Sequence, residues 1–200
     1  MTAIAMAEQE RRQTVSVLFI DIVGFTSLID DLDCAVVRAL QRDYFGIVSE
    51  VVRSGGGVVE KYVGDAVMAV FGTDETGFGP EAAAAAVRVG LSVQEALRGQ
   101  LLAGRFAVRT RVGIATGDVI VDVAATREFG HGMISGSVVA TAARLQAYAP
   151  HDTVVVCSST REASDELIAY QELPPVRVAG KPYPLDLFRA LEPQGVLCVA

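Results

Sequence analysis

Cysteine, histidine and clustered basic residues are all scarce in this sequence of 200 residues. The cysteines, Cys34, Cys157 and Cys198, are three in number and far apart, which excludes a disulfide framework or a CxxC site and predicts a cytoplasmic protein. The two histidines lack an HExxH motif and i, i+4 spacing, so we expect surface or loop residues and not metal ligands. No basic cluster exceeds Arg11-Arg12 and the net charge is −7, which argues against a nucleic-acid partner.

Long hydrophobic segments are also lacking. The alanine run Ala82–Ala86 soon meets Arg88, far short of the ~20 apolar residues that span a membrane. Met1–Ala7 is apolar but short, and charged residues over 8–12 follow it directly. Without a basic n-region or a long hydrophobic stretch, we expect no secretory signal. Hydrophobic residues make up 51% and charged residues 20%, which excludes disorder and fits one globular domain. The expected organisation is a flexible arm over 1–12, one domain over 13–191 and a tail over 192–200.

The hydrophobic patterns predict a mixed α+β fold. We expect strands at 15–20, 58–62, 66–71, 106–115, 119–123 and 153–157, a turn at 116–118, and a closing hairpin of strands 176–178 and 185–190. Helices are expected at 35–52, 80–98, 137–149 and 161–167. The order βαββαβ with C-terminal additions is the ferredoxin-like arrangement, with an antiparallel sheet whose first and third strands are neighbours.

This topology places two aspartates together. Asp21 follows the first predicted strand and Asp65 precedes the third, so antiparallel pairing brings both to one edge of the sheet. Two such carboxylates suit one or two hard divalent cations such as Mg²⁺. An alternative stays open, because Asp after a strand is also a common turn residue that hydrogen-bonds its own backbone.

Other signatures of nucleotide or ester chemistry are missing. The sequence has no GxxxxGK[ST], no GxGxxG after a strand and no GxSxG. Taken alone, Lys61 in a strand and Arg144 in a helix are most simply explained as solvated surface residues. Four longer strings resemble the class III adenylate/guanylate cyclase catalytic domain, and the resemblance spans about 15–191: Phe19–Thr26, Lys61–Phe71, Val112–Gly117 and Ala142–Leu145.

The resemblance implies a class III nucleotidyl cyclase fold and an enzyme that converts ATP to cyclic AMP and pyrophosphate with two Mg²⁺ or Mn²⁺ ions. Two chains of such a homodimer share each active site. One chain contributes metal ligands, which match Asp21, the Ile22 carbonyl and Asp65. The other contributes an adenine-selecting lysine, matched by Lys61, and an arginine that stabilises the transition state, matched by Arg144. The remaining expected substrate contacts are Phe25, Thr26 and Lys181.

The sequence departs from the family pattern on the substrate side. Ala140 stands where the family has a ribose-orienting Asn, and Met133 where it has a second base-selecting Asp or Thr. Ala179 replaces a triphosphate-binding Lys, two positions from Lys181. Alanine and methionine side chains cannot hydrogen-bond a nucleotide as those residues do. We therefore expect low adenylate cyclase activity with relaxed discrimination between ATP and GTP. The alternatives are a catalytically weak or dead domain that binds a nucleotide or a partner as a regulator, and a purely structural dimerisation module.

Overall fold

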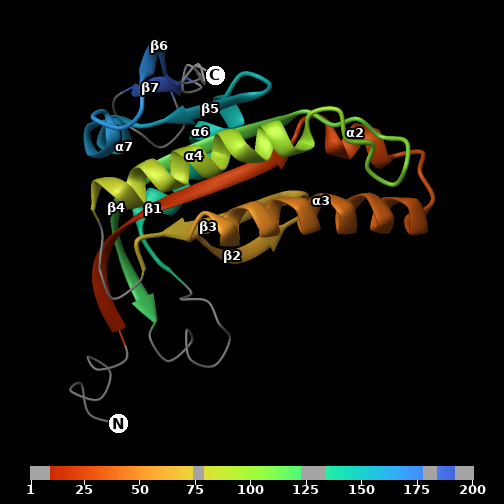
Figure 1. Ribbon diagram of the computed structural model, residues 1–200, viewed down its shortest axis with the longest axis horizontal. Helices are drawn as coiled ribbons and strands as arrows, with labels where there is room; N and C mark the ends of the chain where they lie inside the picture. Colours follow the sequence, from red (N-terminus) through yellow and green to blue (C-terminus); the bar gives the residue numbers. More distant parts are fainter. Residues whose placement is uncertain (1–9, 74–78, 123–133, 178–183, 192–200) are drawn as a thin grey trace, which may run out of the picture.

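The computed structural model describes residues 10–73, 79–122, 134–177 and 184–191 of the chain. Strands and helices follow the predicted alternation (Figure 1). In chain order the elements are β1 (Glu10–Ile22), α2 (Phe25–Ile29), α3 (Cys34–Ser54), β2 (Val58–Val63), β3 (Ala66–Phe71), α4 (Pro80–Leu97), β4 (Thr110–Asp122), α6 (Ser137–Tyr148), β5 (Thr153–Val156), α7 (Ser158–Ser164), β6 (Tyr170–Val176) and β7 (Leu185–Ala190).

The strands form one seven-stranded sheet in the order β2-β3-β1-β4-β5-β7-β6. β1 pairs antiparallel with β3 on one side and with β4 on the other, and β4 pairs parallel with β5. The predicted neighbourhood of the first and third strands is therefore confirmed. The first four strands form the ferredoxin-like core, and β5, β6 and β7 extend the sheet beyond it.

Each face of the sheet has its own hydrophobic core, because side chains alternate along β1. Leu18, Ile20 and Ile22 pack with α3 and α4, which lie along one face (Figure 1). Val15, Val17, Phe19 and their neighbours pack against α6 on the other face. Asp21 continues the second set, so its side chain lies on the α6 side of the sheet.

The expected turn at Thr116–Asp118 is wrong, because β4 runs unbroken through these residues. Their partners on β1 are Ser16, Val15 and Thr14, in continuous register. Asp118 accepts hydrogen bonds at 2.7 Å from both Thr14 Oγ1 and Arg12 Nη2, while Thr116 Oγ1 lies 2.7 Å from Ser16 Oγ. Pairing with a long neighbouring strand therefore overrides the local preference of a Thr-Gly-Asp sequence for a turn.

Four other boundaries differ from the prediction. β4 begins at Thr110 and not at 106. β1 begins at Glu10, so residues 10–12 of the expected arm are strand, paired with the end of β4. α7 occupies 158–164 and not 161–167, and the last hairpin begins with Tyr170–Val176 and not at 176. β6 lies at the edge of the sheet, where Pro174 and Pro175 need no partner for a missing N–H. In the described ranges no helix is long and apolar enough to cross a bilayer.

Candidate active site

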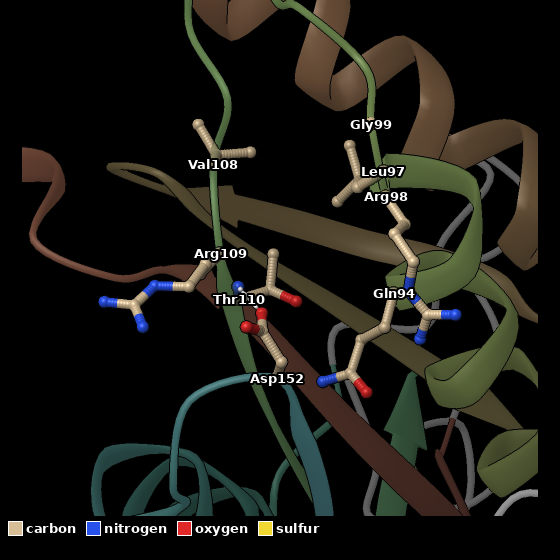
Figure 2. Close-up of a pocket in the computed structure, with 8 residues that line it drawn as sticks. All are labelled: Gln94, Leu97, Arg98, Gly99, Val108, Arg109, Thr110 and Asp152. Atoms are coloured by element: carbon tan, nitrogen blue, oxygen red, sulfur yellow. Dashed lines mark hydrogen bonds between the residues drawn. The ribbon is translucent and has the colours of Figure 1, made fainter.

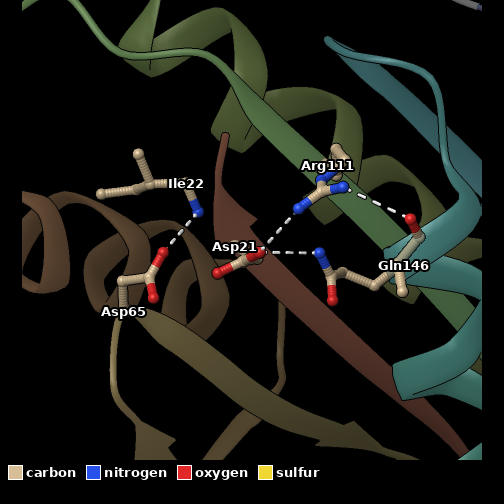
Figure 3. A network of polar contacts seen from close by, with 6 residues as sticks. Asp21, Ile22, Asp65, Arg111 and Gln146 are labelled. Carbon is tan, nitrogen blue, oxygen red and sulfur yellow. Dashed lines mark hydrogen bonds and ion pairs between the residues drawn. The ribbon is translucent and has the colours of Figure 1, made fainter. Parts of the chain in front are cut away.

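Asp65 lies in the tight turn between β2 and β3. Gly64 precedes it with a φ of 65°, a left-handed conformation that glycine adopts without strain. This turn directs the Asp65 carboxylate toward the end of β1, where its Oδ2 accepts a hydrogen bond of 3.2 Å from the backbone N–H of Ile22 (Figure 3). The hairpin therefore brings Asp65 to the edge that also carries Asp21, as the topology predicted.

The two carboxylates interact directly. Burial, together with a hydrogen bond to Asp21 and the negative charge of Asp21, raises the pKa of Asp65 to about 7. Tyr44 of α3 is fully buried close by, and burial and the charges of Asp21 and Asp65 raise the pKa of its hydroxyl. In the absence of a cation Asp65 therefore keeps its proton up to near neutral pH, because a partly buried carboxyl group beside another carboxylate disfavours ionisation.

This donor set fits a hard divalent cation. Carboxylate and carbonyl oxygens are the ligands that Mg²⁺ and Mn²⁺ take, and a cation relieves the repulsion between Asp21 and Asp65. Within the described residues no cluster of three or more His, Cys, Asp or Glu side chains is present, so the protein offers two carboxylates here and not a closed cage. Substrate phosphates commonly complete such an open Mg²⁺ shell.

The residues expected to contact the substrate come from three other elements, α2, β2 and α6. Lys61 is exposed on the edge strand β2, and Arg144 is half-buried on α6, one turn after the exposed Ala140. Thr26 is exposed, whereas Phe25 is only 7% exposed and belongs to the hydrophobic core. Roles in substrate binding for all four stay predictions. Met133, Ala179 and Lys181 lie outside the described residues.

Three polar residues near these positions were missed by sequence reasoning. Arg111 of β4 and Gln146 of α6 both contact Asp21. Glu60, only 4% exposed, lies at a β-bulge beside Lys61 and accepts a hydrogen bond of 3.1 Å from Ile134 N. The contact of Arg111 with Asp21 could in principle have been predicted, because antiparallel register places the two residues directly opposite each other. Neither the bulge nor the position of Gln146 has a comparable sequence signal.

A separate cavity of about 250 Å³ lies between the end of α4 and the start of β4. Gln94, Arg98, Thr110 and Asp152 are among its lining residues, and Asp152 Oδ1 accepts a hydrogen bond of 3.2 Å from Thr110 N (Figure 2). None of the expected site residues lines this cavity. The candidate active site is therefore the open edge at Asp21 and Asp65, and not this pocket.

A ferredoxin-like sheet in which the end of β1 and the β2–β3 turn bring two aspartates to one edge fits a catalytic domain of the class III nucleotidyl cyclase type. Comparison with known families agrees. The chain belongs to the adenylate and guanylate cyclase catalytic domain family, which it matches over residues 7–189.

The chain is also similar to curated proteins that are longer than it is. An uncharacterised protein of Mycobacterium tuberculosis is 32% identical over 175 residues, which cover 80% of this chain and 31% of that protein. Adenylate cyclase 1 of Rhizobium meliloti is 28% identical over 186 residues, 90% of this chain and 28% of that enzyme. The chain thus spans about a third of the length of these curated relatives.

The solved structures include both kinds of cyclase. The adenylyl cyclase CyaB of P. aeruginosa superposes with a TM-score of 0.80 at 24% identity, covering 92% of this chain and 97% of that one. The guanylyl cyclase Cya2 gives 0.79 at 24% identity, covering 91% and 93%. These likenesses establish the fold, and they do not distinguish ATP from GTP as the substrate.

Proposed function

We propose that the chain is an adenylate cyclase domain that converts ATP to 3′,5′-cyclic AMP and pyrophosphate as a homodimer. The observation that carries the proposal is the meeting of Asp21 and Asp65 at one sheet edge, where burial and mutual repulsion raise the pKa of Asp65 to about 7. Carboxylates held together against their repulsion are typical of a site built for a cation.

In this proposal Asp21, Asp65 and the Ile22 carbonyl hold two Mg²⁺ or Mn²⁺ ions. Such ions, when bound, activate a hydroxyl group for attack and neutralise phosphate charge. Arg144 of the partner subunit lies against the α-phosphate and stabilises the charge that develops there in the transition state. Lys61 of the partner subunit donates a hydrogen bond to the base. A donor that faces N1 selects adenine, because adenine N1 accepts a hydrogen bond whereas guanine N1 carries a hydrogen and donates one.

The direct test is incubation of the purified protein with ATP and Mn²⁺, followed by quantification of cyclic AMP. We expect product from the wild type and a loss of several orders of magnitude in both Asp21→Asn and Asp65→Asn, with circular dichroism spectra unchanged. Wild-type product no greater than that of Asp21→Asn would contradict the proposal. A parallel reaction with GTP measures the base preference of the wild type.

A second candidate is a degenerate domain that binds a nucleotide or a partner without turnover. It is favoured by Ala140, which is exposed on α6 four residues before Arg144 and offers no hydrogen bond to a ribose. One lost hydrogen bond of about 0.5–1.5 kcal/mol lowers a rate roughly two- to tenfold, a handicap and not a knockout. Ala140→Asn should raise turnover by that factor, and Met133→Asp should sharpen the preference for ATP. A wild type inactive with either nucleotide, and not rescued by Ala140→Asn, would favour the regulatory domain.

A further inference from the structure

The side of Asp21 that faces away from Asp65 is held by two donors. Asp21 Oδ2 accepts a hydrogen bond of 2.9 Å from Gln146 Nε2 and lies 3.2 Å from Arg111 Nη2. Figure 3 shows Arg111 and Gln146 on one side of the Asp21 carboxylate and Asp65 on the other. One oxygen of Asp21 is thereby occupied, and the other is directed toward Asp65.

The two donors come from different elements that the fold holds firmly. Arg111 is the cross-strand partner of Asp21, since β1 and β4 pair at these residues. Gln146 is buried on α6, whose backbone lies directly against β4 at Gly113. Arg111 Nη1 also donates to the carbonyl of Ala147 at 3.3 Å, so the guanidinium bridges β1 to α6.

Arg111 and Gln146 differ in what they contribute. Arg111 contacts Asp21 through one nitrogen, and its Nε is buried without a hydrogen-bond partner among the described residues. This is not the bidentate geometry in which arginine clamps a carboxylate, so its main contribution is a positive charge beside the acidic pair. Gln146 is neutral and makes the shorter hydrogen bond, so its contribution is to orient the carboxylate of Asp21.

The positive charge of Arg111 at this place opposes the binding of a divalent metal ion. Even with both carboxylates ionised, Asp21, Asp65 and Arg111 together carry a net charge of only −1. The Asp21 and Arg111 side chains are 18% and 26% exposed, so water screens their charges only in part. Such a site attracts a divalent ion weakly until a ligand brings more negative charge. Nucleotide phosphates carry such charge.

We propose that Arg111 and Gln146 are positioning residues of the metal half-site: Gln146 orients Asp21, and Arg111 holds metal affinity low until a nucleotide arrives. The inference rests on the proposed function, because it takes Asp21 and Asp65 as the metal ligands. It predicts that divalent ions bind the free protein weakly and bind together with the substrate. It also predicts that affinity and turnover respond in opposite directions when the charge of Arg111 is removed.

The test is a titration of the nucleotide-free protein with Mn²⁺, in which free Mn²⁺ is followed by electron paramagnetic resonance. Arg111→Gln should bind Mn²⁺ at least about tenfold more tightly, because one unit charge at a few ångströms has roughly that effect on a divalent ion even with water-like screening. Its kcat should nevertheless fall, because the guanidinium no longer bridges Asp21 on β1 to Ala147 on α6. Arg111→Lys keeps the charge and should bind as the wild type does. Arg109→Gln removes the same charge two residues earlier on an exposed side chain, and should change neither quantity.

Gln146→Leu separates orientation from charge, because it removes the amide and leaves every charge in place. We expect kcat to fall about tenfold, with Mn²⁺ affinity within about twofold of the wild type. Thermal unfolding of each variant monitors the fold, and Arg111→Lys shows whether loss of packing alone accounts for any change. A purely structural role of Arg111 would weaken both binding and turnover.

Unchanged or weaker Mn²⁺ binding in Arg111→Gln would overturn the inference, as would the absence of Mn²⁺ binding in both proteins. Binding that persists in Asp21→Asn and Asp65→Asn would instead overturn the metal site of the proposed function. If Arg111→Gln binds Mn²⁺ more tightly but the wild type makes no cyclic AMP, the result would support the inference and contradict the proposed activity. The two failures are thus distinguishable.

Discussion

Asp65 lies half-buried in the β2–β3 turn, beside the carboxylate of Asp21. Its pKa is raised from 3.8 to about 7, chiefly by burial and then by Asp21. A carboxyl group with a raised pKa in the folded state binds its proton more tightly there than in the unfolded chain. The contribution of Asp65 to the free energy of unfolding therefore falls as pH rises from about 4 to about 7, and its loss is complete above that range.

Asp65→Asn should remove this pH dependence in the metal-free protein. At pH 8 we expect the variant to be more stable than the wild type by about 1 kcal/mol, a value reduced from the full shift because water screens a half-exposed group. The difference between the two proteins should shrink toward pH 4. Urea unfolding in EDTA at several pH values measures it, and added Mn²⁺ should stabilise the wild type alone.

Asp118→Asn is the control for this prediction. Hydrogen bonds from Thr14 and then Arg12 lower the pKa of Asp118, which is exposed and removed from the pair. Its contribution to stability is therefore present at neutral pH and is lost in acid, the opposite sign to that of Asp65. If Asp65→Asn is no more stable than the wild type at pH 8, the two carboxylates do not repel each other as inferred.

Helix α6 packs very closely against β4 at Gly113, near the site. A Cβ atom on Gly113 would lie 2.1 Å from Gln146 N and 2.5 Å from Ala142 O, both backbone atoms of α6. Backbone cannot move aside as a flexible side chain does, so Gly113→Ala should push α6 off the sheet. Gln146 and Arg144 move with that helix.

We expect Gly113→Ala to lower the free energy of unfolding by about 1–3 kcal/mol, the usual cost of overpacking, and to reduce turnover further through the displaced α6. Urea unfolding and cyclic AMP formation measure the two effects. Gly46→Ala on α3 is a matched change with nothing within 4 Å of the new methyl group, and it should be neutral or stabilising by up to ~1 kcal/mol. Equal effects of the two changes would contradict this account.

The β-bulge of β2 ties that strand to the segment that leads into α6. Glu60 is buried at the bulge and accepts a hydrogen bond from the buried Ile134 N. Glu60→Ala leaves that N–H without this acceptor, and should lower the free energy of unfolding by about 1–3 kcal/mol. Glu60→Gln keeps a carbonyl oxygen there and should cost less. Thermal unfolding of both variants, with exposed Glu50→Ala as the control, measures the difference.

Elements with strong local patterns were predictable, and those decided by tertiary pairing were not. The helices at 34–54 and 80–97 and the hairpin strands at 58–63 and 66–71 follow from periodicity and from glycine or proline at their ends. The unbroken β4 was not predicted, because its central residues have turn propensity and are held extended by β1. β6 was missed because its two prolines are compatible with a strand only at a sheet edge.

At the site, the aspartate pair followed from topology alone, since only strand order and the positions of two turns were needed. Arg111, Gln146 and Glu60 did not, because their contacts depend on which face a side chain takes and on how closely α6 approaches the sheet. The sequence resemblance supplied Lys61 and Arg144. Their places on β2 and α6 leave their roles as predictions that need a second chain.

At the scale of the whole molecule, the proposed function requires two chains. The metal residues and the substrate residues of one chain serve different active sites of a head-to-tail homodimer in this proposal. A closed two-fold dimer contains two equivalent sites, each with one half from each subunit. The distribution of activity between mutant subunits therefore reports on the assembly itself.

Asp21→Ala and Lys61→Ala should each be inactive or nearly so as purified proteins. Mixed in equal amounts, they form a heterodimer in which one site combines both defects and the other has neither. Random exchange makes about half of the dimers mixed, so the mixture should recover about a quarter of wild-type activity per chain. Cyclic AMP formation measures the recovery, and native mass spectrometry of one tagged variant confirms that mixed dimers are present. A mixture of Asp21→Ala with Asp65→Ala is the matched control, since both changes lie in the same half and no intact site can form. Mixed dimers without recovered activity would show that Asp21 and Lys61 do not serve one site from opposite chains.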